Sequence, residues 1–129
     1  MACLKKIAFV GSFDPFHYGH FNVWRQLTNI FKAEEIFIVI AINSKKSSKN
    51  SLQERKQQIL KFFTNQHLQI NSNQILLCSK LFANFCLQHK ITIFARGIRN
   101  NQDLAYEMNL QKQYLQLNSK LIGIYFFHK

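Results

Sequence analysis

Short apolar runs rich in β-branched residues alternate along this sequence with longer segments of helical periodicity. The apolar runs are residues 4–10, 35–42, 74–78, 91–95 and 121–127. This alternation is the pattern of a parallel sheet whose strands are joined by crossover helices. We therefore expect a single α/β domain, an open parallel sheet of about five strands with crossover helices on both faces.

The segments between these runs carry the signals of helices. Between residues 19 and 31 the apolar residues recur at helical spacing: Val23, Trp24, Leu27, Ile30 and Phe31. Ser51 and Glu54 match a capping box, so a helix begins there and continues to about residue 64. A third helix is marked by Leu81, Phe82, Phe85 and Cys86. A fourth spans residues 103–117, and we expect Trp24 and the phenylalanines to lie in the core.

Length and charge limit the possible functions. A chain of 129 residues fits one domain, so we expect residues 1–129 to form a single domain. Seventeen Lys and Arg against six Asp and Glu give a formal charge of +11, which favours anionic partners such as nucleotides, nucleic acids or acidic lipids. A general solubility bias is the alternative. However, Asp14, Asp103 and Glu107 all fall inside two segments singled out below, residues 11–20 and 95–111, which favours specific roles for them.

The cysteines and the lack of long apolar runs indicate the compartment. Cys3, Cys78 and Cys86 are an odd number without CxxC spacing, so we expect small core residues in a reducing compartment. The N-terminal apolar run is short and contains lysines, unlike a signal peptide. No run approaches the roughly 20 residues of a membrane span. We expect a cytoplasmic protein with no membrane partner.

Loops of unusual composition directly follow three of the predicted strands, at residues 11–19, 43–49 and 96–102. Ligands of open parallel sheets bind beyond the carboxyl ends of the strands, where the strand order reverses. We therefore expect these loops to converge on one pocket.

The first loop has the composition of an anion site. Gly11 allows the backbone to approach a phosphate, and Ser12 adds a hydroxyl. Gly19 and His20 open a helix whose first amides and dipole favour an anion, and His17 can donate to the same anion. Two histidines without a third partner make a poor metal site, so we assign no metal ligand. A plain capped turn explains the glycines but not the histidines.

Other candidates also have structural alternatives. A solvated basic turn accounts for Lys45, Lys46 and Lys49. Arg96 and Arg99 are also placed to cap the following helix or to pair with its acids. Glu107, at helical spacing from Asp103, is equally consistent with an exposed surface. We expect surface or edge positions without a role for His67, His89 and His128.

Two stretches resemble the signatures of one enzyme superfamily. GSFDPFHYGH, residues 11–20, resembles the GxFDPxHxGH signature of the HxGH nucleotidyltransferases, which join a nucleoside triphosphate to a phosphorylated acceptor. ARGIRNNQDLAYEMNLQ, residues 95–111, is similar to the second signature of one branch, the phosphopantetheine adenylyltransferases. The likeness extends over residues 7–127. It implies a Rossmann-like fold and transfer of AMP from ATP to 4′-phosphopantetheine, giving dephospho-coenzyme A and pyrophosphate in coenzyme A synthesis.

The resemblance also implies roles for particular residues. The catalytic positions are matched by His20, Lys46 and Arg99. The ATP-binding positions are matched by Ser12, Phe13, His17, Gly19, His20, Gly97, Arg99 and Glu107. The acceptor-binding positions are matched by Ser12, Lys46, Leu81, Phe82 and Arg96. Ser12 replaces a commoner Thr, and His17 stands where this branch often has Thr. Lys45 and Lys49 are alternatives to Lys46, because the loop is longer than usual.

The partners implied are ATP and 4′-phosphopantetheine, with Mg²⁺ carried by the triphosphate, and a homo-oligomer that is a hexamer in the family. One alternative is another phosphorylated acceptor, nicotinamide mononucleotide or glycerol phosphate. RGIR and DLAYE favour the pantetheine branch over these. The other alternative is a non-catalytic basic nucleic-acid-binding protein, which has the charge alone in its support, so we expect no nucleic-acid partner.

The family continues past its last strand into a serine-rich turn and a helix that complete the ATP phosphate site. This sequence ends at YFFHK, before that segment. The alternatives are that the remaining basic loops suffice, that the protein is weakly active, or that the sequence is shortened.

Overall fold

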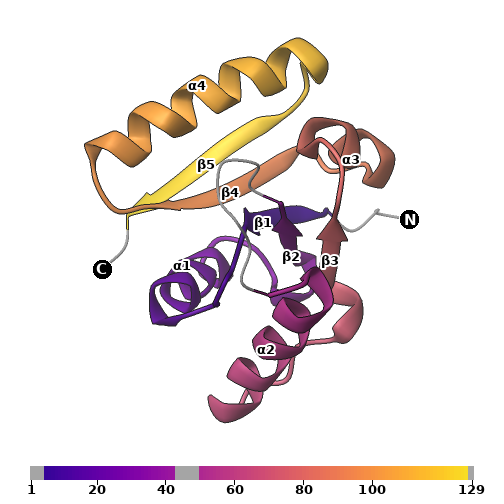
Figure 1. The fold of residues 1–129 in the computed structure, drawn as a ribbon, viewed down its shortest axis with the longest axis vertical. Helices are drawn as coiled ribbons and strands as arrows, with labels where there is room; N and C mark the ends of the chain where they lie inside the picture. The colour runs from indigo at the N-terminus through magenta and orange to yellow at the C-terminus, as the bar shows by residue number, and fades with distance from the viewer. Residues whose placement is uncertain (1–4, 43–49, 128–129) are drawn as a thin grey trace.

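The computed structural model describes residues 5–42 and 50–127, in which the strands form one open parallel sheet (Figure 1). The strands are β1 (Ile7–Gly11), β2 (Ile36–Ala41), β3 (Ile75–Cys78), β4 (Ile93–Ile98) and β5 (Ile122–Phe127). Their order across the sheet is β3-β2-β1-β4-β5, so the chain moves outward from β1 first in one direction and then in the other. The order reverses between β1 and β4, which is where such sheets open a binding crevice. The predicted Rossmann-like class is confirmed.

Helices cover both faces of the sheet. They are α1 (Tyr18–Thr28), α2 (Leu52–Asn65), α3 (Phe82–His89) and α4 (Asn101–Leu117), with short 3₁₀ turns at Ala33–Glu35 and Ser72–Gln74. In Figure 1, α1 and α2 lie below the strands, and α3 and α4 lie above them. A helix stands between each strand and the next, which lets all the strands run in parallel. Within residues 5–42 and 50–127, no helix is long and apolar enough to cross a membrane.

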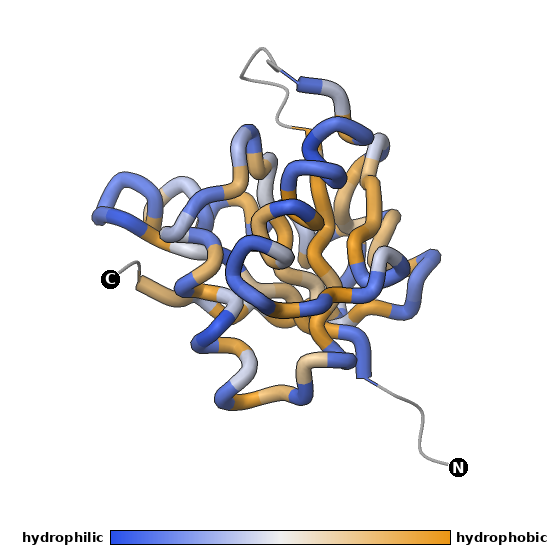
Figure 2. The backbone as a smooth tube through the Cα atoms, turned by 90° about the horizontal axis from the view of Figure 1, so that it is seen from below, coloured by the Kyte–Doolittle hydropathy of each residue, from blue (hydrophilic) through white to orange (hydrophobic). Residues whose placement is uncertain are grey.

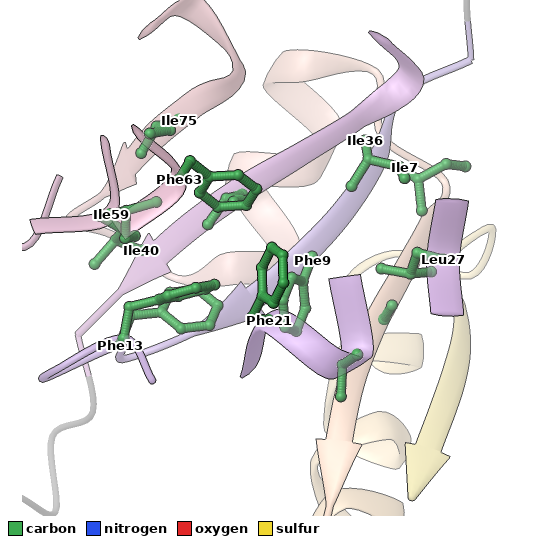
Figure 3. Packing of buried hydrophobic residues seen from close by; sticks show 14 residues of the cluster. Ile7, Phe9, Phe13, Phe21, Leu27, Ile36, Ile40, Ile59, Phe63 and Ile75 are labelled. Atoms are coloured by element: carbon green, nitrogen blue, oxygen red, sulfur yellow. The ribbon is translucent and has the colours of Figure 1, made fainter. Parts of the chain in front are cut away.

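Strand β1 is buried on both faces and divides the core into two layers. Ile7 and Phe9 belong to the layer under α1 and α2, whereas Ala8 and Val10 belong to the layer under α3 and α4. Figure 2 shows the apolar strands running through the middle of the molecule, with hydrophilic segments at the periphery. Figure 3 shows the aromatic centre of the first layer, where the side chains of Phe9, Phe13, Phe21 and Phe63 gather.

Trp24 packs against this first layer, as expected for a core residue. The same expectation is wrong for Phe127, which is 64% exposed. Cys78 and Cys86 are free thiols buried in the second layer, which confirms that they are core residues. Cys3 lies outside the described residues.

Strand β4 is longer than its sequence suggests. The apolar run predicts a strand that ends at Ala95, but β4 continues to Ile98. The reason is its pairing with β5, which joins Arg96 to Tyr125 and Gly97 to Phe126 after the pairing with β1 has ended. Arg96 and Gly97 therefore lie on a rigid strand rather than in a loop, and this corrects the predicted loop over residues 96–102.

Helix α1 ends earlier than the apolar periodicity predicts. The helix stops at Thr28, and the backbone N–H of Asn29 bonds to the carbonyl of Gln26, 3.2 Å away, which tightens the final turn. Ile30, expected on the apolar face of the helix, lies beyond this end and is 59% exposed. Leu27, just inside the end of the helix, is fully buried.

This difference gives a matched test of the core. Leu27→Ala should lower the free energy of unfolding by about 2–5 kcal/mol, because it leaves a cavity in the first layer. Ile30→Ala should change it by less than about 0.5 kcal/mol, because the side chain is exposed. Urea unfolding followed by circular dichroism measures both. Equal losses in the two variants would contradict the position of the helix end.

Candidate active site

Two adjoining cavities open where β1 and β4 end. The first, of about 390 Å³, is lined by Phe9, Val10, Gly11, Ser12, Phe13, His17, His20, Arg96, Gly97, Arg99, Asp103, Tyr106 and Glu107. The second, of about 470 Å³, is lined by Val10, Gly11, Ser12, Ala41, Ile42, Ser79, Lys80, Leu81, Phe82, Arg96, Tyr106, Leu110, Gln113 and Tyr114. Their shared wall is Val10, Gly11, Ser12, Arg96 and Tyr106. Ligands in the two cavities would meet across this wall.

The turn after β1 is anchored by an aromatic side chain. Gly11 ends β1, and a Cβ there would lie 3.0 Å from ring carbons of Phe13, so any side chain at this position would press against that ring. Phe13 has φ 48, and its ring packs edge-on against the rings of Phe9 and His20, with centroids 5.2 and 4.9 Å away. The buried ring of Phe13 thus fixes the turn at the wall of the first cavity.

The two histidines of this turn each use one ring nitrogen to cap α1, so the expectation that a capped turn does not explain them is wrong. Nδ1 of His17 accepts a hydrogen bond from the N–H of Gly19 (3.0 Å), and Nδ1 of His20 accepts one from the N–H of His17 (3.1 Å). The rings stack with centroids 3.8 Å apart. Because Nδ1 is the acceptor, a neutral ring carries its proton on Nε2, which is then a donor. Both Nε2 donors lie at the start of α1, where the helix dipole is positive, and this arrangement is suited to binding an anion.

His17 is held neutral near pH 7. Burial lowers the pKa of His17 below its ordinary value of 6.5, and the nearby Arg99 guanidinium lowers it further. A lowered pKa in the folded state means that the unfolded chain binds this proton more readily. The contribution of His17 to stability is therefore fully present above pH 6.5 and is lost as the pH falls through the lowered pKa.

Each arginine of the cavity wall pairs with an acid of α4. Nε of Arg96 lies 2.6 Å from Oε2 of Glu107, and Nε of Arg99 lies 3.1 Å from Oδ2 of Asp103. Asp103 also accepts a hydrogen bond from the backbone N–H of Arg99, at 3.0 Å. The pairing foreseen as an alternative is thus present, and both arginines line the cavity as well.

Glu107 is buried, with 4% of its surface exposed, so the alternative of a plain surface position is wrong. Burial raises the pKa of Glu107 above its ordinary value of 4.5, and the Arg96 guanidinium partly offsets this rise. A buried carboxylate is costly unless it is paired, so Glu107 fixes the guanidinium of Arg96 on the inner side. The remaining donors of Arg96 are left for groups on its other sides.

Most of the predicted site residues come together here. Those in the first cavity are Ser12, Phe13, His17, His20, Arg96, Gly97, Arg99 and Glu107. Those in the second are Ser12, Arg96, Leu81 and Phe82. Gly19 lines neither cavity and instead helps to cap α1. Lys46 and its alternatives Lys45 and Lys49 lie outside the described residues.

The described part of the chain holds no group of three or more His, Cys, Asp and Glu residues placed to bind a metal ion. The two carboxylates that line the first cavity belong to Asp103 and Glu107, and both are paired with arginines.

Two contributors were not predicted from the sequence. Tyr106 lines both cavities, and its spacing from Asp103 places it on the same helical face, which is the signal that could have found it. Arg55 lies buried beneath the turn after β1. Its four-residue spacing from Ile59 and Phe63 puts it on the buried face of α2, and a charged residue at such a position was the available signal.

Comparison with known proteins identifies relatives over nearly the whole chain. Residues 8–127 match the cytidylyltransferase-like family. The phosphopantetheine adenylyltransferase of Porphyromonas gingivalis is 33% identical over 121 residues, which cover 93% of this chain and 72% of that protein. The chain is also similar to two other enzymes of the same name. The one from Psychromonas ingrahamii is 30% identical over 92% of this chain and 70% of that protein. The one from Mycoplasma capricolum is 29% identical over 95% of this chain and 84% of that protein.

The titration of His17 tests the electrostatics of the first cavity. Its Hε1 resonance, assigned with His17→Gln, should report a pKa below 6.5. Arg99→Gln should raise that pKa, because it removes the second cause of the shift. Pyrophosphate should also raise it, because the anion stabilises the charged ring. Nuclear magnetic resonance titrations measure all three, and a pKa that neither change moves would contradict this placement of His17.

Proposed function

Because the chain belongs to the cytidylyltransferase-like family and, within it, to the phosphopantetheine adenylyltransferases, we propose that it transfers AMP from ATP to 4′-phosphopantetheine, releasing pyrophosphate and forming dephospho-coenzyme A. The observation that carries this proposal is the shared wall between the two cavities. A reaction between two bound phosphates needs adjoining sites that meet at cationic and hydrogen-bonding groups. Ser12 and Arg96, which line both cavities, supply such groups at the meeting point.

The reaction needs no protein nucleophile. A phosphate oxygen of the acceptor attacks the α-phosphorus of ATP, the bond from that phosphorus to the bridging oxygen breaks, and pyrophosphate leaves with the electron pair. Positioning and charge neutralisation supply most of the catalysis in such a transfer. The site therefore has to hold two polyanions in line and stabilise the charge that develops on the leaving oxygen.

We assign the triphosphate to the first cavity. The start of α1 and the Nε2 donor of His20 support this assignment, because both favour negative charge. Arg99 adds a guanidinium to this cavity. The side chain of Arg99 is 68% exposed, so it is able to follow the phosphates as they move. His20 and Arg99 are thus proposed as catalytic residues, with Ser12, Phe13 and His17 as further contacts. Gly97 and Glu107 line the nucleotide side, and Gly19 acts by capping α1.

We assign the acceptor to the second cavity. Arg96 is proposed to bind the acceptor phosphate at the shared wall, while Glu107 holds its guanidinium from behind. Leu81 and Phe82 offer an apolar edge for the pantetheine arm. Lys46, from the loop after β2, is proposed to neutralise phosphates of both substrates.

Further parts of the proposal rest on the family. Mg²⁺ is proposed to enter with ATP, held mainly by phosphate oxygens and waters. We also propose that residues 1–129 form a single nucleotidyltransferase domain, that the protein assembles as a homo-oligomer, a hexamer as in the resembled family, and that it acts in the cytoplasm.

Pyrophosphate release tests the function. The protein with ATP, Mg²⁺ and 4′-phosphopantetheine should release pyrophosphate, whereas nicotinamide mononucleotide and glycerol phosphate should give little. His20→Ala should lower kcat by about 100- to 1,000-fold, because it removes a donor to developing charge. His89→Ala is the matched control, since His89 lies at the end of α3 and lines neither cavity.

Faster release with another acceptor would reassign the substrate, and no release with any acceptor would reject the enzymatic proposal. Wild-type turnover of a folded His20→Ala variant would remove His20 from its role. Circular dichroism and urea unfolding establish that the variants are folded.

The acceptor assignment predicts a selective effect at the apolar edge. Leu81→Ala should raise KM for 4′-phosphopantetheine about tenfold, because a buried contact of a few methylene groups is lost, and should leave KM for ATP unchanged. Leu87→Ala is the control, because Leu87 is similarly exposed on α3 (54% against 62% for Leu81) but lines neither cavity. Initial rates with each substrate varied measure both constants. An unchanged acceptor KM in Leu81→Ala would refute the assignment.

A further inference from the structure

Arg55 is a buried cation beneath the turn that follows β1, with 2% of its surface exposed. Its Nη1 donates to the carbonyl of Ser12 (3.0 Å), and its Nε donates to the carbonyl of Asn50 (2.9 Å). Nε also lies 3.9 Å from Oδ2 of Asp14. Nδ2 of Asn50 donates to Oδ1 of the same carboxylate (2.7 Å). One guanidinium thus joins the turn after β1 to the residues that lead into α2.

The contact with Ser12 fixes the direction of the next peptide group. The Ser12–Phe13 bond is trans, because the cis bond among the described residues is Asp14–Pro15. In a trans peptide the C=O and the N–H point to opposite sides of the chain. The carbonyl of Ser12 points toward Arg55 on α2, so the N–H of Phe13 points away from α2.

The first cavity lies on this side of the turn, away from α2. Ser12 and Phe13 line this cavity, and its described lining includes no residue of α2. The ring of Phe13 also lies against that of His20, with centroids 4.9 Å apart, so a shift of the turn would move the histidine as well. The turn therefore links the buried contact between Arg55 and the Ser12 carbonyl to two hydrogen-bond donors on the cavity side, the Phe13 N–H and the His20 ring.

We infer that Arg55 is a positioning residue, which holds the turn so that the Phe13 N–H and the His20 ring face a phosphate of ATP in the first cavity. The identity of the ligand rests on the function proposed above. Arg55 lines neither cavity, so it acts through the backbone of the turn. Lysine is a poor substitute, because its donors radiate from a single atom, whereas guanidinium offers five N–H groups in a fixed plane.

The test replaces the guanidinium of Arg55 by the ammonium group of lysine, which keeps the positive charge. Arg55→Lys keeps a positive charge beside Asp14 but cannot match the contacts with both carbonyls. We expect kcat/KM for ATP to fall about 100-fold, as for a small misplacement of reacting groups, with KM for ATP raised more than KM for the acceptor. Simple loss of folded protein would instead lower the apparent kcat and leave both KM values as they are. Lys61→Arg is the matched control, since it makes the reverse exchange at an exposed position of the same helix.

A folded Arg55→Lys variant with wild-type kcat/KM for ATP would overturn the inference. If that variant does not fold, Arg55→Gln decides, because its amide buries no charge and cannot match the contacts of the guanidinium with both carbonyls. A several-fold loss in kcat/KM for ATP supports the inference, and a wild-type value overturns it.

Binding measurements separate this inference from the proposed function. If the wild-type protein releases no pyrophosphate with any acceptor, the proposed function fails. Calorimetric titration of inorganic pyrophosphate into the wild-type protein and Arg55→Lys then decides the positioning role. Weaker binding by the variant supports it, whereas equal binding, or none by either protein, overturns it.

Discussion

The parallel pairing of β1 with β4 is the contact on which the candidate site depends. The two strands run side by side from Ile7 with Ile93 to Phe9 with Ala95 and then separate. Strand β1 ends at Gly11 and turns toward α1, while β4 continues along β5. Arg96 stands at the point of separation, with Nη1 3.5 Å from the carbonyl of Val10. The two cavities therefore share a wall because neighbouring strands diverge there, each strand supplying one side of it.

Three of the few acids in the chain hold the arginines near this wall. The acids that face arginines are Asp14 beside Arg55, Asp103 beside Arg99 and Glu107 beside Arg96. Two others cap local structure, since Glu35 accepts from the N–H of Lys32 and Glu54 from that of Ser51. The acids thus fix the arginines, while the net charge of +11 remains to attract polyanions.

The sequence predicts the fold better than it predicts the ends of elements or the geometry of the site. Apolar periodicity and the capping box of Ser51 and Glu54 are local signals, and the structure contains both the sheet and the cap. The end of β4 depends on β5, which follows it only after a whole helix, and no local pattern around Gly97 reports that pairing. Most of the candidate residues came from two motifs, whose spacing cannot show that Glu107 is buried against Arg96. The role of Arg55 was missed because its hydrogen-bond acceptors are backbone carbonyls, which cannot be read from side-chain identity, although its charge on the buried face of α2 was a signal.

Burial and charge at the wall link protonation to the binding of anions. In the ligand-free protein, burial and the Arg99 guanidinium lower the pKa of His17, whereas burial raises that of Glu107 against the effect of Arg96. A phosphate beside either arginine would cancel part of its field, which raises the pKa of the histidine and of the carboxyl alike. Both groups would then favour their protonated forms, so that bound anions and protons stabilise one another by linkage. Each proton that His17 or Glu107 takes up on anion binding would offset part of the charge of the anion, in addition to the neutralisation by the permanent cations.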